Sequence, residues 1–317
     1  MKTVLVTGAS GFLGLALTEA LARRGDRVIA LDLGVGKSLL QLHEAHSNVI
    51  PLVGDLMEWP SLANAFKVHG PDAVIHCAAI VGVPASVGTP LNTMRVNIEG
   101  TINLLECMRL FGTRRMLQIS SEEVYGDFLS DRIDETHPRD PIQAYGISKL
   151  ACEQLAKTYV ALYGMECLNM RTCWVYGPQL PRERVPKNFL TAAVTGRSLH
   201  LSRGADTLID HTYIDDFVTG VIAALDHKHH KFDTYHITSG EAVTLGDIVK
   251  IVRELKPGAD ISIGPGQYLH GPNVPAVRKG ALDISRAKAA FGYTPAFNMR
   301  AGLLRSLEIM SRQQLIG

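Results

Sequence analysis

Tyr145 and Lys149 are the two residues of this chain best suited to acid–base chemistry. They lie four positions apart, which places a phenol and an ammonium on one face of a helix. A tyrosine with an ordinary pKa of about 10 is a poor base at neutral pH, and lowering that pKa to about 7 requires about 4 kcal/mol of preferential stabilisation of the phenolate. The Lys149 cation is one source of this stabilisation. Because the chain has nine tyrosines, this spacing also arises by chance and needs support from other residues.

Ser121 provides part of that support. It lies in the segment Ser-Ser-Glu-Glu-Val-Tyr-Gly at 120–126, directly after a predicted strand. Its hydroxyl is therefore expected to lie near Tyr145 and to hydrogen-bond a substrate hydroxyl or carbonyl oxygen.

A glycine-rich segment near the N-terminus is suited to binding a pyrophosphate. Residues 7–14 read Thr-Gly-Ala-Ser-Gly-Phe-Leu-Gly, follow the first predicted strand and open the first predicted helix. Glycines allow the tight turn, and backbone N–H groups at the positive helix end can approach phosphate. An ordinary glycine-rich turn is the alternative. The candidate contacts are Gly8, Ser10, Gly11, Phe12, Leu13 and Gly14.

Asp32 indicates which dinucleotide would bind there. It ends the second predicted strand, where an acidic residue accepts hydrogen bonds from a ribose 2′-hydroxyl. Its charge would repel a 2′-phosphate, which favours NAD over NADP. The alternative is a helix-capping or loop aspartate. The positive nicotinamide of bound NAD+ would be a second cation able to lower the pKa of Tyr145.

Strands and helices alternate in the first half of the chain. Apolar runs predict strands at 3–7, 27–31, 48–53, 73–77, 115–120 and 165–171, with helical spacing between them, as at 14–24 and 92–111. This alternation predicts an α/β fold of the Rossmann type, with a doubly wound parallel sheet. Ligands of such sheets bind beyond the carboxyl ends of the strands. Loops are therefore expected to converge on one crevice after Thr7, Asp32, Asp55, Cys77, Ser121 and Arg171.

The pattern changes after Tyr176. Prolines and basic residues punctuate the chain from Gly177, and 264–275 is rich in glycine and proline, which indicates a smaller, loop-rich part. Residues 213–225 and 233–238 are expected to return a helix and a strand to the main sheet. We therefore expect a dinucleotide-binding domain at 1–176, with 212–238 returning to it, and an interleaved substrate-binding part at 177–211 and 239–317.

Composition and charge exclude several classes of protein. The 317 residues are 46% hydrophobic and 20% charged, which suits a sizeable core and excludes a disordered chain. Lys and Arg total 32 against 31 Asp and Glu, so no basic field favours nucleic acid or an anionic membrane, and a small molecule is the expected partner. Five scattered cysteines encode neither a disulfide framework nor a metal site, and no apolar stretch is long enough for a signal peptide or a membrane span. A soluble, cytoplasmic protein is expected.

Ordered motifs cover almost the whole chain: the glycine segment, Gly54-Asp55-Leu56, His76-Cys77-Ala78-Ala79, and the segments 96–101, 120–126, 145–149, 175–178 and 213–216. Together they resemble the extended short-chain dehydrogenase/reductase family, in its NAD-dependent epimerase/dehydratase branch. The resemblance implies Tyr145 as base, Lys149 lowering its pKa and holding the nicotinamide ribose, and Ser121 polarising the reacting oxygen.

The resemblance also implies further contacts with the cofactor. Asp55 and Leu56 would lie near the adenine, Ala78 and Ala79 would pass close to the cofactor, and Asn97 would hold the active-site helix in place. An Asn97 that only satisfies buried backbone groups is an equal alternative.

Enzymes of this branch oxidise a secondary alcohol with NAD+, and the ketone is then reduced again, loses water or CO2, or is released. The two residues after the serine bear on that choice, and here they are Glu122 and Glu123. Two carboxylates beside a ketone are able to supply the acid and base for elimination. The alternative is that one or both are solvated loop charges.

The substrate side departs from the family pattern. Trp174 stands where nucleotide-sugar members carry Asn, Ile209 where they carry Arg, and Asn273 where another diphosphate-binding Arg is expected. Neither an isoleucine nor an asparagine side chain binds phosphate through two parallel hydrogen bonds as arginine does, which argues against a nucleotide-diphosphate substrate. Ser86 matches a sugar-contacting position, and Trp174 either stacks on a ring or fills the core. The candidate substrate contacts are Ser86, Ser121, Trp174, Asn188 and Arg278, with Arg182, Arg184, Lys187 and Arg203 as other available cations.

Two functions stay open. The first is an NAD-dependent oxidoreductase of the epimerase/dehydratase type that oxidises a secondary alcohol of a sugar or nucleotide-sugar-like substrate, with Tyr145 as base. The alternative is a net dehydrogenase of a non-nucleotide sugar, sugar acid or other small alcohol. A non-catalytic NAD-binding regulator is disfavoured because the serine, tyrosine and lysine are all present. The resemblance also implies a homodimer through helices at 92–111 and 144–163, whose apolar residues equally suit the core: Ile102, Leu105, Leu155 and Leu162.

Overall fold

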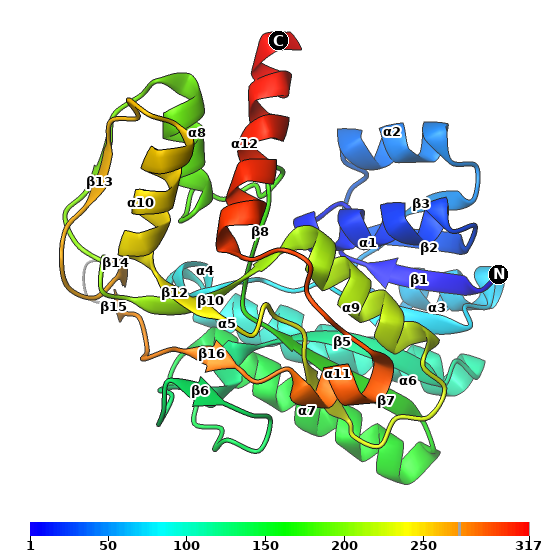
Figure 1. Cartoon of the computed structure of the whole chain (residues 1–317). Coiled ribbons are helices and arrows are strands. Elements are labelled where there is room, and N and C mark those ends of the chain that lie inside the picture. Colours follow the sequence, from blue (N-terminus) through cyan, green and yellow to red (C-terminus); the bar gives the residue numbers. More distant parts are fainter. Residues whose placement is uncertain (272–273, 317) are drawn as a thin grey trace. The chain divides into compact units, whose positions relative to one another are not determined.

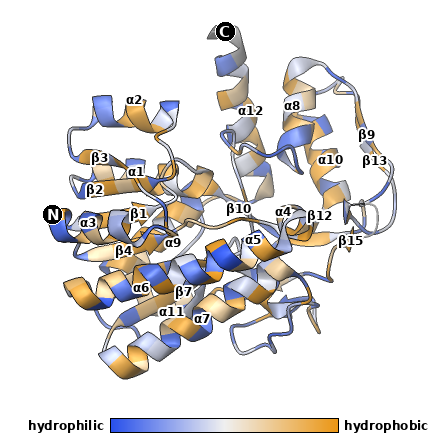
Figure 2. Ribbon diagram, turned by 180° about the vertical axis from the view of Figure 1, so that it is seen from behind, coloured by the Kyte–Doolittle hydropathy of each residue, from blue (hydrophilic) through white to orange (hydrophobic). Residues whose placement is uncertain are grey.

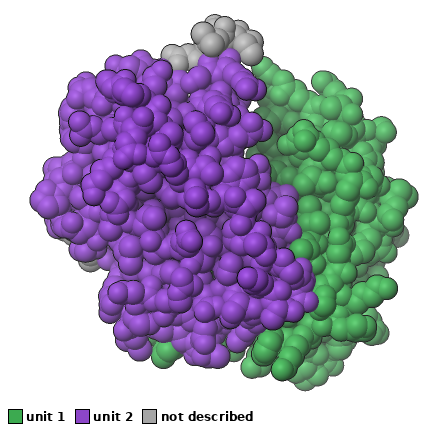
Figure 3. Space-filling view, viewed as in Figure 1, with its two compact units in different colours: residues 1–126, 138–171, 221–235 green, residues 127–137, 172–220, 236–317 purple. Residues whose placement is uncertain are grey.

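The computed structural model describes residues 1–271 and 274–316, and the chain divides into two compact units. Unit 1 comprises Met1–Gly126, Pro138–Arg171 and Val221–Tyr235, and unit 2 comprises Asp127–His137, Thr172–Gly220 and His236–Gly317. Figure 3 shows the two units in green and purple. Segment 127–137 is part of unit 2 because its strand β6 (Arg132–Ile133) pairs with β16 (Ala281–Leu282). The division into a cofactor domain and a substrate-binding part remains a prediction.

Unit 1 is built on a seven-stranded sheet with the order β11-β7-β5-β4-β1-β2-β3 (Figure 1). Every strand predicted from the sequence is present within two residues of its expected bounds, and β11 is the strand expected to return at 233–238. Aliphatic side chains such as Val4, Leu5 and Val6 are fully buried, as expected of strands covered on both faces. The strands are β1 (Thr3–Thr7), β2 (Arg27–Asp32), β3 (Val49–Val53), β4 (Ala73–His76), β5 (Arg115–Ser121), β7 (Glu166–Thr172) and β11 (Thr234–His236).

Parallel pairing brings the carboxyl ends of the central strands to one edge of the sheet. Thr7 of β1 is level with Leu31 of β2 and His76 of β4, and His76 is level with Gln118 of β5. The strand order reverses between β1 and β4. Such a reversal is the point where doubly wound sheets bind their ligands.

Helices cover both faces of this sheet. Helix α1 lies on the opposite side from α6 and α7 (Figure 1), and α3 packs against α6, which packs against α7. Figure 2 shows hydrophilic and hydrophobic residues alternating along α6 and α7, and buried residues such as Phe66, Leu104 and Met108 pack against the strands. The helices are α1 (Phe12–Arg23), α2 (Lys37–Ala45), α3 (Trp59–His69), α6 (Gly100–Phe111) and α7 (Ala144–Tyr163).

The single helix expected at 92–111 is interrupted. It consists of α5 (Pro90–Met94), a π-helical turn at Arg95–Glu99 and α6, and α4 (Val83–Gly88) precedes it. Within the turn, the Asn97 side chain hydrogen-bonds the backbone of Ile80 and the hydroxyl of Ser148. π-turns inside helices often mark functional positions, and here the turn directs Asn97 toward the loop that follows β4.

Unit 2 has short strands and a group of helices. A three-stranded sheet has the order β12-β10-β8, and two-stranded pairs are formed by β13 with β9, β14 with β15 and β16 with β6. Helices α8, α10 and α12 pack against one another. Helix α10 buries Leu245, Ile248, Val249 and Val252 at helical spacing, with the Thr244 hydroxyl as its N-cap.

The bounds of the elements of unit 2 are as follows. Helix α9 (Ile214–Asp226) begins in unit 2 and ends in unit 1. The other strands are β8 (Trp174–Tyr176), β9 (Leu199–Leu201), β10 (Leu208–Tyr213), β12 (Ala242–Thr244), β13 (Ile261–Ile263), β14 (Leu269–Gly271) and β15 (Val274–Pro275). The other helices are α8 (Lys187–Thr195), α10 (Leu245–Leu255), α11 (Ser285–Phe291) and α12 (Met299–Ile316).

Among the described residues, no helix combines the length and apolar character needed to cross a membrane. In the same part of the chain, no group of three or more His, Cys, Asp or Glu side chains is arranged to hold a metal ion.

Candidate active site

The glycine segment forms a tight turn between β1 and α1. Gly8 has a φ of +67°, and a Cβ atom there would lie 2.8 Å from the backbone nitrogen of Ala78. At Gly14, a Cβ atom would lie 2.1 Å from the carbonyl oxygen of Gly8. Both positions therefore require glycine, because the obstructing atoms belong to the backbone. The turn brings β1, α1 and the loop after β4 together where the strand order reverses.

The first turn of α1 faces this region with its backbone N–H groups. Gly11 is the N-cap and makes no side-chain capping hydrogen bond. The first N–H groups of an α-helix have no acceptor within the helix, and here they belong to Phe12, Leu13 and Gly14. Together with the positive end of the helix, they form a suitable site for a pyrophosphate.

Asp32 lies at the end of β2, beside the glycine turn. Its carboxylate accepts hydrogen bonds from the backbone N–H of Ser10 at 2.8 Å and of Leu33 at 2.7 Å. The Ser10 hydroxyl donates to the carbonyl of Gly34 at 2.8 Å. An ionised carboxylate has about four acceptor positions, so Asp32 is able to bind the turn and ribose hydroxyls at once.

The residues expected near the adenine differ in their surroundings. Asp55 accepts a hydrogen bond from the N–H of Met57 at 2.9 Å. Leu56 is buried against α6, where a Cβ atom at Gly100 would lie 2.9 Å from the Leu56 Cβ. Leu56 therefore serves the core, whatever it contributes to a ligand.

The loop after β4 is fixed from both ends. The N–H of Ala78 donates to the Thr7 hydroxyl at 3.2 Å, and Ala79 follows it, half-buried. The Asn97 amide accepts from the N–H of Ile80 at 2.7 Å and donates to the Ser148 hydroxyl at 2.9 Å. Asn97 therefore joins this loop to α7, and the two interpretations of Asn97 from the sequence describe the same contacts.

Tyr145 and Lys149 lie together on α7. Both side chains are buried, and Nζ of Lys149 is 5.9 Å from the centroid of the Tyr145 ring. Nζ also donates to the carbonyl of Ile119 at 2.8 Å. Burial lowers the pKa of Lys149, against the raising effect of the nearby Cys152, Cys77 and Glu153. The ammonium is thus held where its charge favours a phenolate at Tyr145.

Gly146 lets the start of α7 pack directly on the segment after β5. A Cβ atom there would lie 2.4 Å from the carbonyl oxygen of Glu123. Ser121 is the N-cap of the short 3-10 helix η2 (Glu122–Tyr125), and its hydroxyl accepts from the N–H of Glu123 at 3.2 Å. This packing joins the segment of Ser121 to the end of α7 that carries Tyr145.

Glu122 and Glu123 are both buried, with 3% and 7% of their surfaces exposed. Neither is the solvated loop charge considered as an alternative from the sequence. Glu122 accepts a hydrogen bond from the Ser121 hydroxyl at 3.0 Å. Burying a carboxylate is costly unless polar partners surround it, and the Ser121 hydroxyl is one such partner of Glu122.

A buried ion pair that was not predicted from the sequence contacts the same segment. Glu153 accepts hydrogen bonds from Nε and Nη2 of Arg171, at 2.9 and 2.6 Å. It also accepts from the Ser120 hydroxyl at 2.6 Å, while Arg171 donates to the Tyr125 hydroxyl at 2.7 Å. The pair therefore connects β5, η2, α7 and β7. The available signal was spacing, since Glu153 is four residues after Lys149 and so lies on the same helix face.

Ser86 and Ser121, two of the predicted substrate contacts, belong to unit 1, and the other three belong to unit 2. Ser86 is fully buried, and its hydroxyl donates to the carbonyl of Val83 within α4 at 2.9 Å. In unit 2, the Asn188 amide oxygen accepts from the N–H of Phe189 at 2.9 Å. Arg278 is exposed and pairs with Asp131 at 2.8 Å. Arg278 and Asn188 thus bind different segments of unit 2.

Trp174 is buried in an aromatic cluster of unit 2. Its ring centroid lies 5.6 Å from that of His211 and 5.7 Å from that of Tyr268, both edge to face. Ile209 is fully buried in β10. Asn273, the other position where an arginine was expected, lies outside the described residues.

Comparisons with known proteins agree with this geometry. The model of the NAD-dependent epimerase/dehydratase family matches residues 4–238. The chain belongs to this family. UDP-glucuronate 4-epimerase 4 of Arabidopsis thaliana is 31% identical over 95% of this chain and 73% of its own length.

Two solved structures of similar proteins show how far the likeness extends. UDP-glucose 4-epimerase of Thermotoga maritima, solved with UDP-glucose, has a TM-score of 0.87 and 26% identity over 99% of both chains. UDP-glucuronic acid 4-epimerase of Bacillus cereus, solved with UDP-glucuronic acid and NAD, has a TM-score of 0.85 and 25% identity over 98% of this chain and 99% of that one. The Rossmann-type fold expected from the sequence is thereby confirmed.

As a member of the NAD-dependent epimerase/dehydratase family, the protein is an NAD-dependent enzyme, as the resemblance implied. The described residues fit that cofactor. The glycine turn has no room for a Cβ atom at Gly8 or Gly14, the start of α1 offers N–H donors, and the carboxylate of Asp32 lies at the turn after β2. These three features suit a pyrophosphate and an unphosphorylated ribose.

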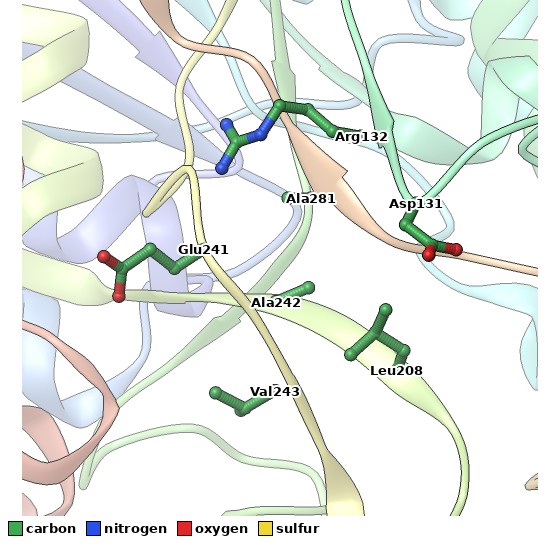
Figure 4. A pocket seen from close by; sticks show the side chains of 7 residues that line it. All are labelled: Asp131, Arg132, Leu208, Glu241, Ala242, Val243 and Ala281. Atoms are coloured by element: carbon green, nitrogen blue, oxygen red, sulfur yellow. The ribbon is translucent and has the colours of Figure 1, made fainter.

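Unit 2 of this family member also has an open cleft of about 440 Å³. Leu208, Ala242, Val243 and Ala281 line it, with the charged residues Asp131, Arg132 and Glu241. Figure 4 shows the guanidinium of Arg132 and the carboxylate of Asp131 pointing apart, and Arg132 donates to the carbonyl of Gly240 at 2.9 Å. None of the predicted site residues lines this cleft, and we assign it no function.

Proposed function

We propose that this protein is an NAD-dependent epimerase of a UDP-linked sugar, with Tyr145 as the base. The observation that carries the proposal is the buried Tyr145–Lys149 pair on α7, packed through Gly146 against the segment of Ser121. The similar proteins named above are 4-epimerases of UDP-glucuronate and UDP-glucose. UDP-glucuronate is the first substrate to test.

Each reacting residue has a distinct function in this proposal. Bound NAD+ supplies a hydride acceptor. Tyr145, kept ionised by Lys149, removes the proton from the substrate hydroxyl, and Ser121 donates a hydrogen bond to the same oxygen as it becomes a carbonyl. When the hydride returns to the opposite face of the same carbon, Tyr145 gives the proton back to that oxygen, so the base ends each turnover as it began.

Lys149 has a structural reason to remain in place through this cycle. Its hydrogen bond to the carbonyl of Ile119 anchors the ammonium to β5, and the surrounding protein excludes water from it. A cation in a medium of low dielectric acts more strongly on a neighbouring phenolate than it would in water.

A net dehydrogenase of a non-nucleotide sugar or sugar acid is the second candidate. Ile209 favours it, because the side chain is apolar and fully buried where the resemblance implies a diphosphate-binding arginine. The two candidates differ in whether NADH leaves the enzyme.

Incubation of the purified protein and NAD+ with UDP-glucuronate, and separately with free glucuronate, tests both candidates. An epimerase converts UDP-glucuronate to the 4-epimer, separable by chromatography, without stoichiometric NADH in solution. A dehydrogenase gives one NADH per oxidised substrate, read at the absorbance band of NADH.

Tyr145→Phe tests the assigned base. We expect turnover to fall by about 100-fold or more, with NAD still bound because the glycine turn and Asp32 are unchanged. Tyr163→Phe is the matched control, since Tyr163 lies on the same helix and is 46% exposed. Near-normal turnover by Tyr145→Phe would show that the base is another group.

The homodimer and the cytoplasmic location belong to this proposal. Leu105 and Leu155 pack in or against the core of unit 1, whereas Leu162 on α7 is 66% exposed. Leu162→Glu is therefore expected to shift a dimer toward monomer in sedimentation velocity, and an unchanged dimer would place the interface elsewhere. The five cysteines carry free thiols, which suits a reducing compartment, and cell fractionation tests the location.

A further inference from the structure

We infer that Arg184, held over Trp174 beside His211, is the anion-binding group of a substrate site in unit 2. The ligand chemistry is an oxyanion next to a hydroxyl, which is found in the diphosphate of a nucleotide sugar and in the carboxylate of a sugar acid. This inference rests on the proposed function, because it names the group that would recognise the substrate. It also accounts for the missing arginine at position 209.

Strand register places the departures from the family pattern side by side. β10 pairs parallel with β8, and His211 is the partner of Trp174. Side chains two residues apart on a strand share a face, so Ile209 and His211 lie on one face of β10. Both are buried, with 0% and 3% of their surfaces exposed. Ile209, at the position where the resemblance implies an arginine, is therefore the next side chain on the face of β10 that carries His211.

A guanidinium reaches this place from another segment of the chain. Cζ of Arg184, in the loop between β8 and α8, lies 4.1 Å from the centroid of the Trp174 ring. Arg184 is half-buried. Burial lowers the pKa of His211 to about 3, and the charge of Arg184 contributes to the lowering. The Arg184 charge therefore acts at His211, which shares a face of β10 with Ile209.

Stacking on an indole suits an arginine for binding an anion. In such a stack the face of a guanidinium lies on the ring, and its N–H donors point outward in the guanidinium plane. Five such donors in a fixed fork match the oxygens of a carboxylate or a phosphate. Trp174 would thus orient the group as well as bury part of it.

His211 indicates a second feature of the ligand. Its Nδ1 lies 3.2 Å from the carbonyl oxygen of Ile209, a contact that requires the proton on Nδ1. Nε2 is then an acceptor, and it is buried with no hydrogen-bond partner among the described residues. Buried polar atoms in proteins nearly always have a partner. A ligand hydroxyl would donate to Nε2 while its oxyanion meets Arg184.

The other basic residues considered from the sequence are placed differently. Arg203 donates through Nε to the carbonyl of Gln267 at 3.0 Å, and Lys187 lies 3.9 Å from the Glu183 carboxylate. Arg182 is exposed. Among the described arginines and lysines, only Arg184 has a cation–π contact with Trp174. Arg182, two residues away, provides a matched control.

Titration calorimetry on the full-length enzyme tests the inference, with UDP-glucuronate, UDP-glucose and free glucuronate as probes. Arg184→Met is expected to raise the Kd of UDP-glucuronate by about 10- to 100-fold, with Arg184→Lys in between and Arg182→Met unchanged. A similar rise in the Kd of UDP-glucose in Arg184→Met shows that Arg184 binds the diphosphate. A rise in Kd confined to UDP-glucuronate and free glucuronate shows that Arg184 binds the carboxylate. An unchanged Kd in Arg184→Met overturns the inference.

Tryptophan fluorescence gives an independent measurement that needs no variant in the site. The chain has two tryptophans, so Trp59→Phe leaves only Trp174 to report. UDP-glucuronate is expected to change the fluorescence emission of Trp174, and this titration should give the same Kd as calorimetry. Binding of UDP-glucuronate without any change in the emission overturns the inference. The proposed function has a separate test, and it fails if Tyr145→Phe retains turnover. Arg184→Met should retain bound NAD whether or not its Kd for UDP-glucuronate changes.

Discussion

The Ser121 hydroxyl donates a hydrogen bond to the Glu122 carboxylate at 3.0 Å and accepts one from the N–H of Glu123 at 3.2 Å. A serine hydroxyl has one proton to donate. Ser121 therefore has to turn from Glu122 to reach a substrate oxygen, and the carboxylate competes with the substrate for that proton. Glu122 in this arrangement orients the donor and does not itself need to exchange protons with a substrate.

Ser121→Ala and Glu122→Gln should therefore differ in effect. Loss of the hydroxyl that we propose polarises the reacting oxygen is expected to lower kcat by about 100-fold. Glu122→Gln keeps an acceptor for Ser121 and should lower kcat by less than about tenfold. Steady-state kinetics with UDP-glucuronate measures both values.

Deuterium incorporation separates this orienting function from acid–base chemistry at Glu122. An epimerase that works through Tyr145 alone exchanges no carbon-bound hydrogen with solvent, so product made in D2O should carry no deuterium on carbon. Deuterium on a sugar carbon, with an equal kcat loss in Glu122→Gln and Ser121→Ala, would instead favour elimination through the carboxylates.

Gly146→Ala should damage catalysis more than folding. The new Cβ would lie 2.4 Å from the carbonyl oxygen of Glu123, so α7 and η2 must separate, at a cost of about 1–3 kcal/mol. Because this moves Tyr145 away from Ser121, we expect kcat/KM to fall by at least about tenfold. Gly88→Ala is the control, since a Cβ there meets nothing within 4 Å. Equal kinetics in the two variants would show that this packing does not position the base.

Local patterns in the sequence predicted the elements that carry the chemistry. Helix α7 has the bounds expected, 144–163, and the glycine turn has the expected strand before it and helix after it. Strand and helix periodicity are set by near neighbours, which a single sequence contains. Segment 127–137 could not be assigned to unit 2, because its strand β6 pairs with β16, which is distant in the sequence.

Buried charge is the other feature that the sequence did not predict. Glu122, Glu123, Glu153 and Arg171 are buried, whereas charged residues are usually exposed. Burial of a charge depends on partners that only the fold brings together, such as Glu153 of α7 and Arg171 of β7. The sequence showed Ile209 at the position where the resemblance implies an arginine, but it did not show that Arg184 lies over Trp174.

The Glu153–Arg171 pair predicts strong non-additivity. Arg171→Met leaves a buried carboxylate unpaired, and Glu153→Leu leaves a buried guanidinium, so each is expected to cost about 3–5 kcal/mol of unfolding free energy in urea. The double variant should be more stable than either single one. The exposed Arg300–Glu254 pair is the control, where the coupling should be at most about 1 kcal/mol. Additive losses at Glu153 and Arg171 would contradict this account.

His76 should make stability depend on pH between about 6.5 and 3. Its Nε2 meets the Thr101 hydroxyl at 3.1 Å, and because that hydroxyl donates to the carbonyl of Asn97, Nε2 carries the proton. Nδ1 then accepts from the Thr7 hydroxyl at 2.8 Å. A second proton would disrupt this arrangement, and burial, with the Lys149 charge, lowers the pKa of His76 to about 3.

The sign of the His76 effect follows from the ordinary histidine pKa of about 6.5 in the unfolded chain. Below that pH the unfolded state takes up a proton that the folded state refuses, so stability is complete above pH 6.5 and is lost as pH falls. At pH 5 the loss is about 2 kcal/mol. The His76→Asn variant should have a lower free energy of unfolding in urea at pH 7.5. Between pH 7.5 and 5, this free energy should fall by about 2 kcal/mol less in the variant than in the unsubstituted protein. Since His211 and the carboxylates remain in both proteins, they cancel in the comparison, and parallel curves would mean that His76 titrates normally in the fold.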